Sequence, residues 1–301
     1  MVRKCPIRLG FVFALMDEAR PFIREWPMKP VHPLPGFSFF QGEDVAAVVT
    51  GMGSERASAG TTALLSWIYT ENRALAPHRF FGRTSRLPDF SLFNIGLAGR
   101  IDRNPETLGQ TFLIHRLRHQ ATGETFYPDL LYRWEGVPEA SLTTVAKPVF
   151  GDSAKEGLDA DLVDMEGSGI LIGARAFLQN HQVHFYKIAS DLLSPMKNLR
   201  QTTGPWLQQS ARKLVPGLKR WLSQPPESPP LTEAQFVWMH SVAEKLRFSF
   251  TRTKTWEQLC LSTVLQGKPL PLDYHPPANL SKKDQHEQWH HMQKLLGVTK
   301  P

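Results

Sequence analysis

The feature that most constrains the fold is a regular alternation of strand-like and helix-like segments over the first 222 residues. Short runs rich in Val, Ile, Phe and Thr alternate with longer amphipathic segments, which is typical of an α/β domain built on a central sheet. Predicted strands cover residues 7–14, 36–41, 44–50, 90–96, 111–117, 141–149 and 183–190. Predicted helices cover residues 17–26, 163–181 and 205–222. A further predicted helix begins near residue 54, with Ser54 as its predicted N-cap. From this alternation alone we expect a mostly parallel sheet.

A proline-rich segment ends this pattern. Residues 223–231, SQPPESPPL, contain four prolines within six positions, which neither a helix interior nor a sheet accommodates. We therefore expect a stiff linker between a domain over residues 1–222 and an appendage over residues 232–301. The appendage has helical patterns at 232–247, 254–265 and 280–296 and is short for a deep core of its own.

Composition and charge narrow the class of protein. The chain has 301 residues, of which 41% are hydrophobic, enough for one large core. Its two cysteines, Cys5 and Cys260, are too few for a disulfide framework and fit a reducing cytosol. The amino terminus begins basic and then turns apolar, but Arg8 and Glu18 argue against a secretory signal. No uninterrupted apolar stretch has the length of a membrane span.

The formal net charge of +7 is compatible with binding to nucleic acid or to an anionic surface. The basic residues form no long run and no motif interleaved with aromatic residues. We therefore favour a solvated basic surface over a nucleic-acid partner. A nucleic-acid-binding role for residues 232–301 stays open as an alternative and would show as salt-dependent binding.

Acidic residues follow several of the predicted strands. In open α/β sheets, ligands bind beyond the carboxyl ends of the strands. Glu18 follows the first strand, Glu166 opens a predicted helix after a short apolar run, and Asp191 follows strand 183–190. Each acid alone is explained as a helix-end or solvated residue, but together they predict a site. The end of strand 90–96 instead carries small residues that let a ligand approach the backbone: Gly96, Ala98 and Gly99.

Six segments resemble the ordered motifs of the purine nucleoside phosphorylase superfamily. They are ALMDEA, VVTGMGSERASAGTT, NIGLAGRID, FGDSAK, ADLVDMEGSGI and KIASD, and they lie within residues 7–222. Within the superfamily they are most similar to the methylthioadenosine/S-adenosylhomocysteine nucleosidases. The resemblance implies an α/β, three-layer αβα nucleoside phosphorylase-like fold with a mixed central sheet, followed here by a small C-terminal helical extension.

The resemblance also assigns roles to individual residues. Glu18 matches the acid that polarises the attacking water, and Asp191, supported by Ser190, matches the acid that protonates the leaving purine. Glu166 matches the carboxylate that grips the ribose hydroxyls, with Met165 packed against the sugar. The other matched substrate-binding positions are Leu97, Ala98, Gly99, Asp152 and Ala154. Cleavage of an N-glycosidic bond builds positive charge on the sugar and negative charge on the base, so it needs both an anion and a proton donor.

Hydrolysis is favoured over phosphorolysis. Bacterial hexameric phosphorylases place a phosphate-binding arginine two residues before the glycine of the NIG-like segment, where this chain has Asn94. Arg56 and Arg100 lie near the same loops and keep a phosphorylase open as an alternative. A non-catalytic nucleoside-binding module is a further alternative. We expect an N-glycosyl hydrolase that releases the base of a purine nucleoside or of a 5′-substituted adenosine derivative.

Three features depart from the family pattern. Ala154 and Lys155 stand where the family has an aromatic and an aliphatic residue around the adenine, and Lys187 replaces an arginine. Residues 71–89 read as an insertion. We expect a cytoplasmic homodimer with a small-molecule nucleoside as its partner, no cofactor, no metal in the site and no membrane association.

Residues 286–290, HEQWH, have the H-E-x-x-H spacing of zinc peptidases. The extended metzincin pattern would require glycine at 293 and histidine at 296, where this chain has Gln293 and Leu296. His240 and His275 are further imidazoles in the same appendage. An apolar stripe recurs at helical spacing along this segment: Trp289, Met292, Leu295 and Leu296. We therefore expect a helix that packs on the nucleosidase-like domain or on a second copy, and no stoichiometric zinc in the purified protein.

Overall fold

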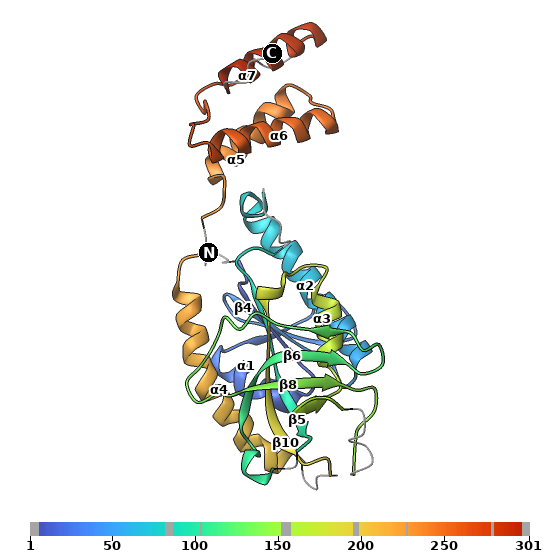
Figure 1. Cartoon of the computed structure of the whole chain (residues 1–301). Helices are drawn as coiled ribbons and strands as arrows, with labels where there is room; N and C mark the ends of the chain where they lie inside the picture. Colours follow the sequence, from blue (N-terminus) through green and yellow to red (C-terminus); the bar gives the residue numbers. More distant parts are fainter. Residues whose placement is uncertain are drawn as a thin grey trace. The chain divides into compact units, whose positions relative to one another are not determined.

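The computed structural model describes residues 6–81, 87–102, 104–151, 158–194, 199–226, 228–277 and 280–296. The chain divides into two compact units (Figure 1). The first comprises Met1–Leu75 and Ser85–Pro226, and the second comprises Ala76–Thr84 and Glu227–Pro301. The segment at 76–84, part of the apparent insertion, therefore belongs with the C-terminal helices.

The first unit consists of one sheet and its covering helices. The described strands are β1 (Leu9–Phe13), β2 (Lys29–Val31), β3 (Ser38–Gln41), β4 (Val45–Val49), β5 (Ser91–Arg100), β6 (Thr111–His119), β7 (Thr125–Phe126), β8 (Glu139–Thr144), β9 (Leu162–Asp164) and β10 (Val183–Asp191). The described helices of this unit are α1 (Met16–Glu25), α2 (Ser54–Leu75), α3 (Gly167–Ala174) and α4 (Leu199–Ser223).

Strand β5 joins a closed ring of strands to an open wing. The ring runs β10-β6-β8-β9-β5 and closes because β10 also pairs with β5, while β1, β4, β3 and β2 extend from β5 as the wing. Among the described strands, five pairings are parallel and five are antiparallel. The mixed sheet implied by the family resemblance is thus confirmed. The mostly parallel sheet expected from the alternation is wrong, because that pattern does not specify which strands pair.

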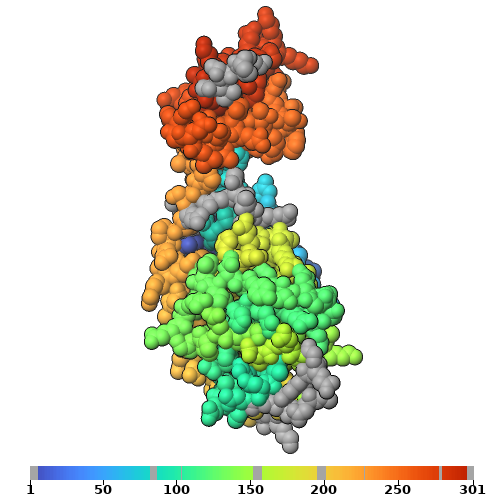
Figure 2. All heavy atoms as spheres, viewed as in Figure 1, coloured from blue at the N-terminus to red at the C-terminus, as the bar shows by residue number. Residues whose placement is uncertain are grey.

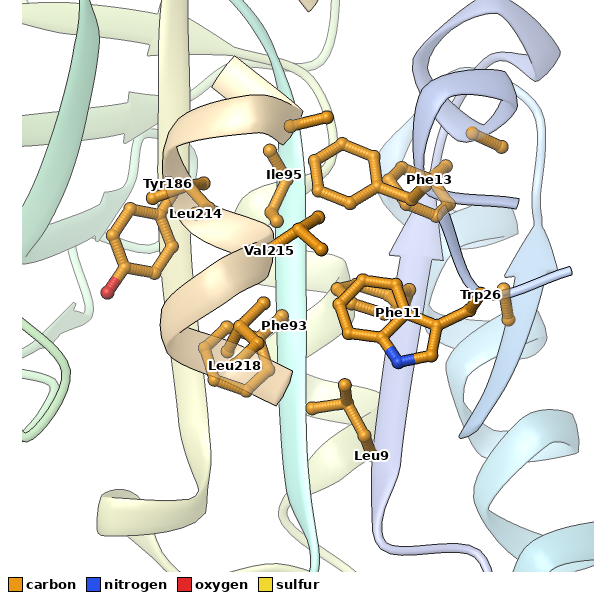
Figure 3. Packing of buried hydrophobic residues seen from close by; sticks show 14 of the residues in the cluster. Leu9, Phe11, Phe13, Trp26, Phe93, Ile95, Tyr186, Leu214, Val215 and Leu218 are labelled. Carbon is orange, nitrogen blue, oxygen red and sulfur yellow. The ribbon is translucent and has the colours of Figure 1, made fainter. Parts of the chain in front are cut away.

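Helices cover both faces of this sheet and give the expected three layers (Figure 1). Helices α1 and α4 contact each other on one face, and α2 and α3 contact each other on the other. Alternate residues of β1 point to the same face of the sheet, so its aromatic residues meet α1 and α4. The side chains of this core include Leu9, Phe11, Phe13, Trp26, Phe93, Ile95, Leu214 and Leu218 (Figure 3). Phe22 belongs to the same core.

Helix α3 lies close to the start of α2 because glycines stand at the contact. A Cβ on Gly169 would lie 2.0 Å from the carbonyl oxygen of Ser54, and one on Gly173 would lie 2.6 Å from that of Ser58. Ser54, the predicted N-cap, is instead the first helical residue, since the carbonyl of Gly53 accepts the first helical hydrogen bond. This contact holds the start of α2 beside the residues that open α3.

The second unit contains α5 (Glu233–Lys245), α6 (Phe250–Leu265) and α7 (Lys282–Leu295). Figure 2 shows their atoms packed together in orange and red. Three tryptophans lie in one buried core with Met239 and Cys260: Trp238, Trp256 and Trp289. The segment therefore contains a buried core, but residues 232–301 do not form it alone. Phe81, which precedes α5 by more than 150 residues, packs on Phe236 with ring centroids 5.9 Å apart.

The apolar stripe of the HEQWH segment packs into this same core. Trp289, Met292 and Leu296 are all buried, and the ring of Trp289 lies 6.3 Å from that of Trp256 on α6. The helix is present as predicted. The expectation that its stripe packs on the nucleosidase-like domain or on a second copy is wrong for these three residues, which are buried within the second unit itself, and Leu295 is 43% exposed. No described helix combines the length and apolar character that a bilayer crossing requires.

Candidate active site

A cavity of about 410 Å³ lies at the carboxyl ends of β1, β5 and β10 and at the start of α3. The predicted site residues that line it are Glu18, Leu97, Ala98, Gly99, Met165, Glu166, Ser190 and Asp191. Two more, Asp152 and Ala154, lie outside the described residues. The structure therefore brings three carboxyl groups from three distant segments to one cavity, and it adds Asp164 as a fourth.

Glu18 is buried in a cradle of backbone amides. Its Oε2 accepts hydrogen bonds from the N–H groups of Ala14 and Leu15 at 2.9 and 3.0 Å, and its Oε1 accepts one from Leu97 at 2.9 Å. A Cβ on Gly96 would lie 2.9 Å from Oε1, so the glycine leaves room for the carboxylate. Burial raises the pKa of Glu18 more than the amide hydrogen bonds lower it. Glu18 is thus a buried carboxyl group held at a fixed position.

Glu166 links the start of α3 to the start of α2. It follows β9 as the N-cap residue of α3, and its Oε1 accepts a hydrogen bond from the N–H of Gly53 at 2.8 Å. Burial, and then the neighbouring Asp164 carboxylate, raise the pKa of Glu166 to about 7, although Lys187 acts in the opposite direction. This carboxyl group is therefore protonated more readily than an exposed glutamate.

Asp191 reaches the cavity at an irregularity in β10. The register between β10 and β5 shifts between Ala189 and Asp191, so Asp191 pairs with Gly99 and Ser190 is left out of the ladder. Bulges of this kind re-aim side chains, and here both Ser190 and Asp191 line the cavity. The Ser190 hydroxyl donates to Asp191 Oδ2 at 2.8 Å, and the Leu193 N–H donates to Oδ1 at 3.0 Å. These two donors orient the carboxyl group.

A buried ion pair joins Asp164, at the cavity wall, to Lys187, and this pairing was not predicted from the sequence. Lys187 Nζ lies 2.8 Å from Asp164 Oδ2, and each side chain is only 1% exposed. Asp164 also accepts from the Thr144 hydroxyl at 2.7 Å and from the Gly167 N–H at 2.8 Å. Burial lowers the pKa of Lys187, but Asp164 and Glu166 outweigh it and raise the pKa overall. A lysine within the apolar run VHFYKIAS is the signal that could have indicated a buried pair, since buried lysines are almost always paired.

The positions considered for phosphate binding do not face the cavity. Asn94 is buried and donates from Nδ2 to the Val12 carbonyl at 3.0 Å. Arg100 holds Asp102 through two hydrogen bonds at 2.8 and 2.6 Å, and Arg56 Nε donates to a backbone carbonyl at 2.7 Å. Among the described residues that line the cavity, none is an arginine or a lysine.

Comparisons with known proteins identify the fold. No protein-family model matches the chain. No curated protein matches it either. Among solved structures, the 5′-methylthioadenosine nucleosidase of Arabidopsis thaliana in its apo form matches with a TM-score of 0.52 and 18% identity, over 72% of this chain and 96% of that chain.

Two ligand-bound nucleosidases give similar matches. The 5′-methylthioadenosine/S-adenosylhomocysteine nucleosidase from S. pneumoniae, with a transition-state inhibitor, has a TM-score of 0.51 and 16% identity, over 72% of this chain and 98% of that chain. The enzyme from Colwellia psychrerythraea, in complex with adenine, has a TM-score of 0.51 and 17% identity, over 73% of this chain and 96% of that chain. The chain therefore has the fold of the methylthioadenosine/S-adenosylhomocysteine nucleosidases, as its motifs predicted, together with an additional C-terminal unit.

Proposed function

We propose that this protein hydrolyses the N-glycosidic bond of a purine nucleoside or of a 5′-substituted adenosine derivative and releases the base. The observation that carries the proposal is the convergence of Glu18, Glu166 and Asp191 on one cavity from three separate segments. Solved nucleosidases of the same fold, one of them in complex with adenine, support a nucleoside as the ligand.

Glu18 is suited to orient and deprotonate a water molecule. A carboxylate offers about four acceptor positions, and three backbone amides occupy three of those of Glu18. The remaining position can accept a hydrogen bond from one water, which fixes that water relative to the sugar. Because burial raises the pKa of Glu18, the carboxylate is a stronger base than an exposed glutamate.

Glu166 and Asp191 are suited to the two ends of the breaking bond. In the proposed reaction, Glu166 binds the ribose hydroxyls and its negative charge stabilises the positive charge that develops on the sugar. Asp191, positioned by Ser190 and the Leu193 amide, gives a proton to the departing base. Two acids in different surroundings can thus serve opposite roles in one site.

Hydrolysis fits the described lining better than phosphorolysis. Phosphate carries about two negative charges near neutral pH and is usually held by cationic side chains or by a series of backbone amides. The described lining contributes only carboxylates as charged groups. A phosphate dianion placed among them would be repelled, whereas a neutral water would not.

A product assay with and without inorganic phosphate tests the proposal. The full chain is incubated with methylthioadenosine, S-adenosylhomocysteine, adenosine and inosine, and free base and sugar products are separated by chromatography. We expect free base and unphosphorylated sugar at equal rates in both conditions. Strict dependence on phosphate would establish the phosphorylase alternative instead, and nucleoside binding without any turnover would establish a binding module.

Substitution of the proposed acid tests its role. Asp191→Asn keeps the shape of the side chain but has no proton to give, so we expect most turnover to be lost while nucleoside binding persists. Asp159→Asn is the matched control, because Asp159 is exposed, pairs with Arg116 and does not line the cavity. Near-native turnover by Asp191→Asn would show that the proton comes from another group.

A further inference from the structure

Two histidines on α7 approach each other on the exposed side of the helix. His286 and His290 are four residues apart, and their Nε2 atoms lie 3.1 Å apart with the two ring planes at 88°. At this spacing the side chains are neighbours on consecutive turns of an α-helix. In the structure one Nε2–H donates a hydrogen bond to the other Nε2, and the two ring nitrogens thus lie beside each other at the helix surface.

The helix that carries this pair is fixed at its start and along its buried side. Ser281 caps its first turn, and the Asp284 side chain accepts hydrogen bonds from the backbone and hydroxyl of Ser281. Trp289 and Met292 hold the opposite side in the core of the second unit. The backbone that sets the spacing of the two imidazoles is thus held by contacts of the helix itself.

The separation of the two nitrogens fits a shared metal ion. With metal–nitrogen bonds of about 2.0–2.1 Å, a nitrogen separation of 3.1 Å gives a nitrogen–metal–nitrogen angle of about 100°. That angle lies between octahedral and tetrahedral values. An ion would replace the proton shared by the two nitrogens, and each ring would rotate so that its Nε2 lone pair faces the ion. Imidazole is a preferred ligand of Cu²⁺, Ni²⁺ and Zn²⁺, with Cu²⁺ bound most strongly of these.

We propose that His286 and His290 form a two-imidazole site for an exchangeable divalent transition-metal ion of the Cu²⁺, Ni²⁺ and Zn²⁺ class. Within the described residues, no group of three or more His, Cys, Asp or Glu side chains is arranged to hold a metal. The ion therefore keeps solvent in its remaining positions and exchanges freely, unlike a structural zinc with four protein ligands. Such an ion is lost during purification in metal-free buffer.

Metal binding at this pair would also stabilise the last helix. The ion bridges one turn of α7, and a ligand that binds only the folded state raises its stability by mass action. This role is independent of nucleoside cleavage, which uses groups of the first unit. The site also differs from a zinc peptidase centre, since Gln293 and Leu296 stand where the extended motif needs a glycine and a third histidine.

Titration of the full chain with Cu²⁺ tests the site. The protein is treated with a chelator, desalted, and titrated with CuCl₂ at neutral pH, with tryptophan fluorescence and electron paramagnetic resonance as readouts. We expect one Cu²⁺ ion per chain to bind more tightly than the remaining, nonspecifically bound Cu²⁺. Its electron paramagnetic resonance spectrum should show two nitrogen ligands, and tryptophan fluorescence should be quenched. Chelation is expected to reverse the binding and to leave any nucleoside turnover unchanged.

Histidine substitutions separate the site from nonspecific binding. His286→Gln removes one exposed imidazole, and because two-point attachment strengthens binding by about a hundredfold or more, the affinity should fall by about that factor. His291→Gln is the matched control, because this adjacent histidine lies against the ring of Tyr274, with centroids 5.2 Å apart. Equal Cu²⁺ affinity in the wild type and His286→Gln, or an equal loss in both variants, would overturn the proposal.

Discussion

The buried ion pair between Lys187 and Asp164 provides a quantitative prediction about stability. Lys187→Met keeps a long flexible side chain in the same space but removes the ammonium group. Asp164 then loses its counter-ion at a site where both side chains are 1% exposed. A charge left unpaired in such a place loses both its hydration and its partner, so the folded state is destabilised.

The size of this effect follows from what remains around Asp164. Removal of one partner from a buried pair costs about 3–5 kcal/mol. Asp164 keeps its hydrogen bonds from Thr144 and Gly167, so we expect the lower end of that range, about 3 kcal/mol. Lys219→Met is the matched control, because Lys219 and Glu25 are 48% and 46% exposed and 3.7 Å apart. For that exposed pair we expect a loss of at most about 1 kcal/mol.

Urea unfolding of the three proteins, followed by circular dichroism, measures these differences. With a denaturant slope of about 3 kcal/mol/M, the midpoint for Lys187→Met should fall by about 1 M. The double variant Lys187→Met with Asp164→Leu removes both charges and should be more stable than Lys187→Met alone. Unfolding of Lys187→Met at the same urea concentration as Lys219→Met, or no recovery on adding Asp164→Leu, would contradict a stabilising buried pair.

Three further predictions concern Glu166, the contact between α2 and α3, and the second core. The pKa of Glu166 is raised from 4.5 to about 7, so between these pH values the folded state binds more protons than the unfolded chain. The free energy of unfolding therefore falls as the pH rises through this window. Glu166→Gln should reduce that fall, which urea titrations at several pH values in the window measure. Gly169→Ala places a methyl group 2.0 Å from a backbone oxygen and should lower the free energy of unfolding by about 3 kcal/mol. Ile172→Ala, at a 51% exposed position of the same helix, should change it by about 0.5 kcal/mol or less in the same assay. Trp256→Ala removes a fully buried side chain and should cost about 3–5 kcal/mol, while a loss below about 1 kcal/mol would contradict the packing described for the second unit.

The positions of the carboxyl groups could be predicted because each follows a local pattern. Glu18 and Asp191 come directly after apolar runs that read as strands, and Glu166 opens a helical segment. Strand ends on one edge of a sheet meet in space, so three local patterns suffice to predict one cavity. The roles assigned to these residues remain predictions, because they depend on chemistry that the geometry alone does not test.

Other features depend on contacts between distant segments and leave little trace in the local sequence. The pairing of β10 with both β5 and β6 closes the ring, but the run VHFYKIAS has the same pattern whichever strands lie beside it. The partner of Lys187 likewise follows from that topology, which brings β10 and the end of β9 together. In the sequence alone, residues 76–84, as part of residues 71–89, read as an insertion. Their packing becomes apparent only in the folded chain, where Phe81 contacts the core of the C-terminal helices.

The chain enters the second unit twice, once between α2 and β5 and again after α4. A single proteolytic cut in the proline-rich segment would therefore leave two polypeptides joined by noncovalent packing, because Phe81 precedes the cut and Phe236 follows it. A gene that ended at that segment would encode a chain in which Phe81 lacks its aromatic partner, Phe236. The C-terminal helices thus pack on an interior segment of the chain. A shortened version of this protein would need that segment redesigned as well.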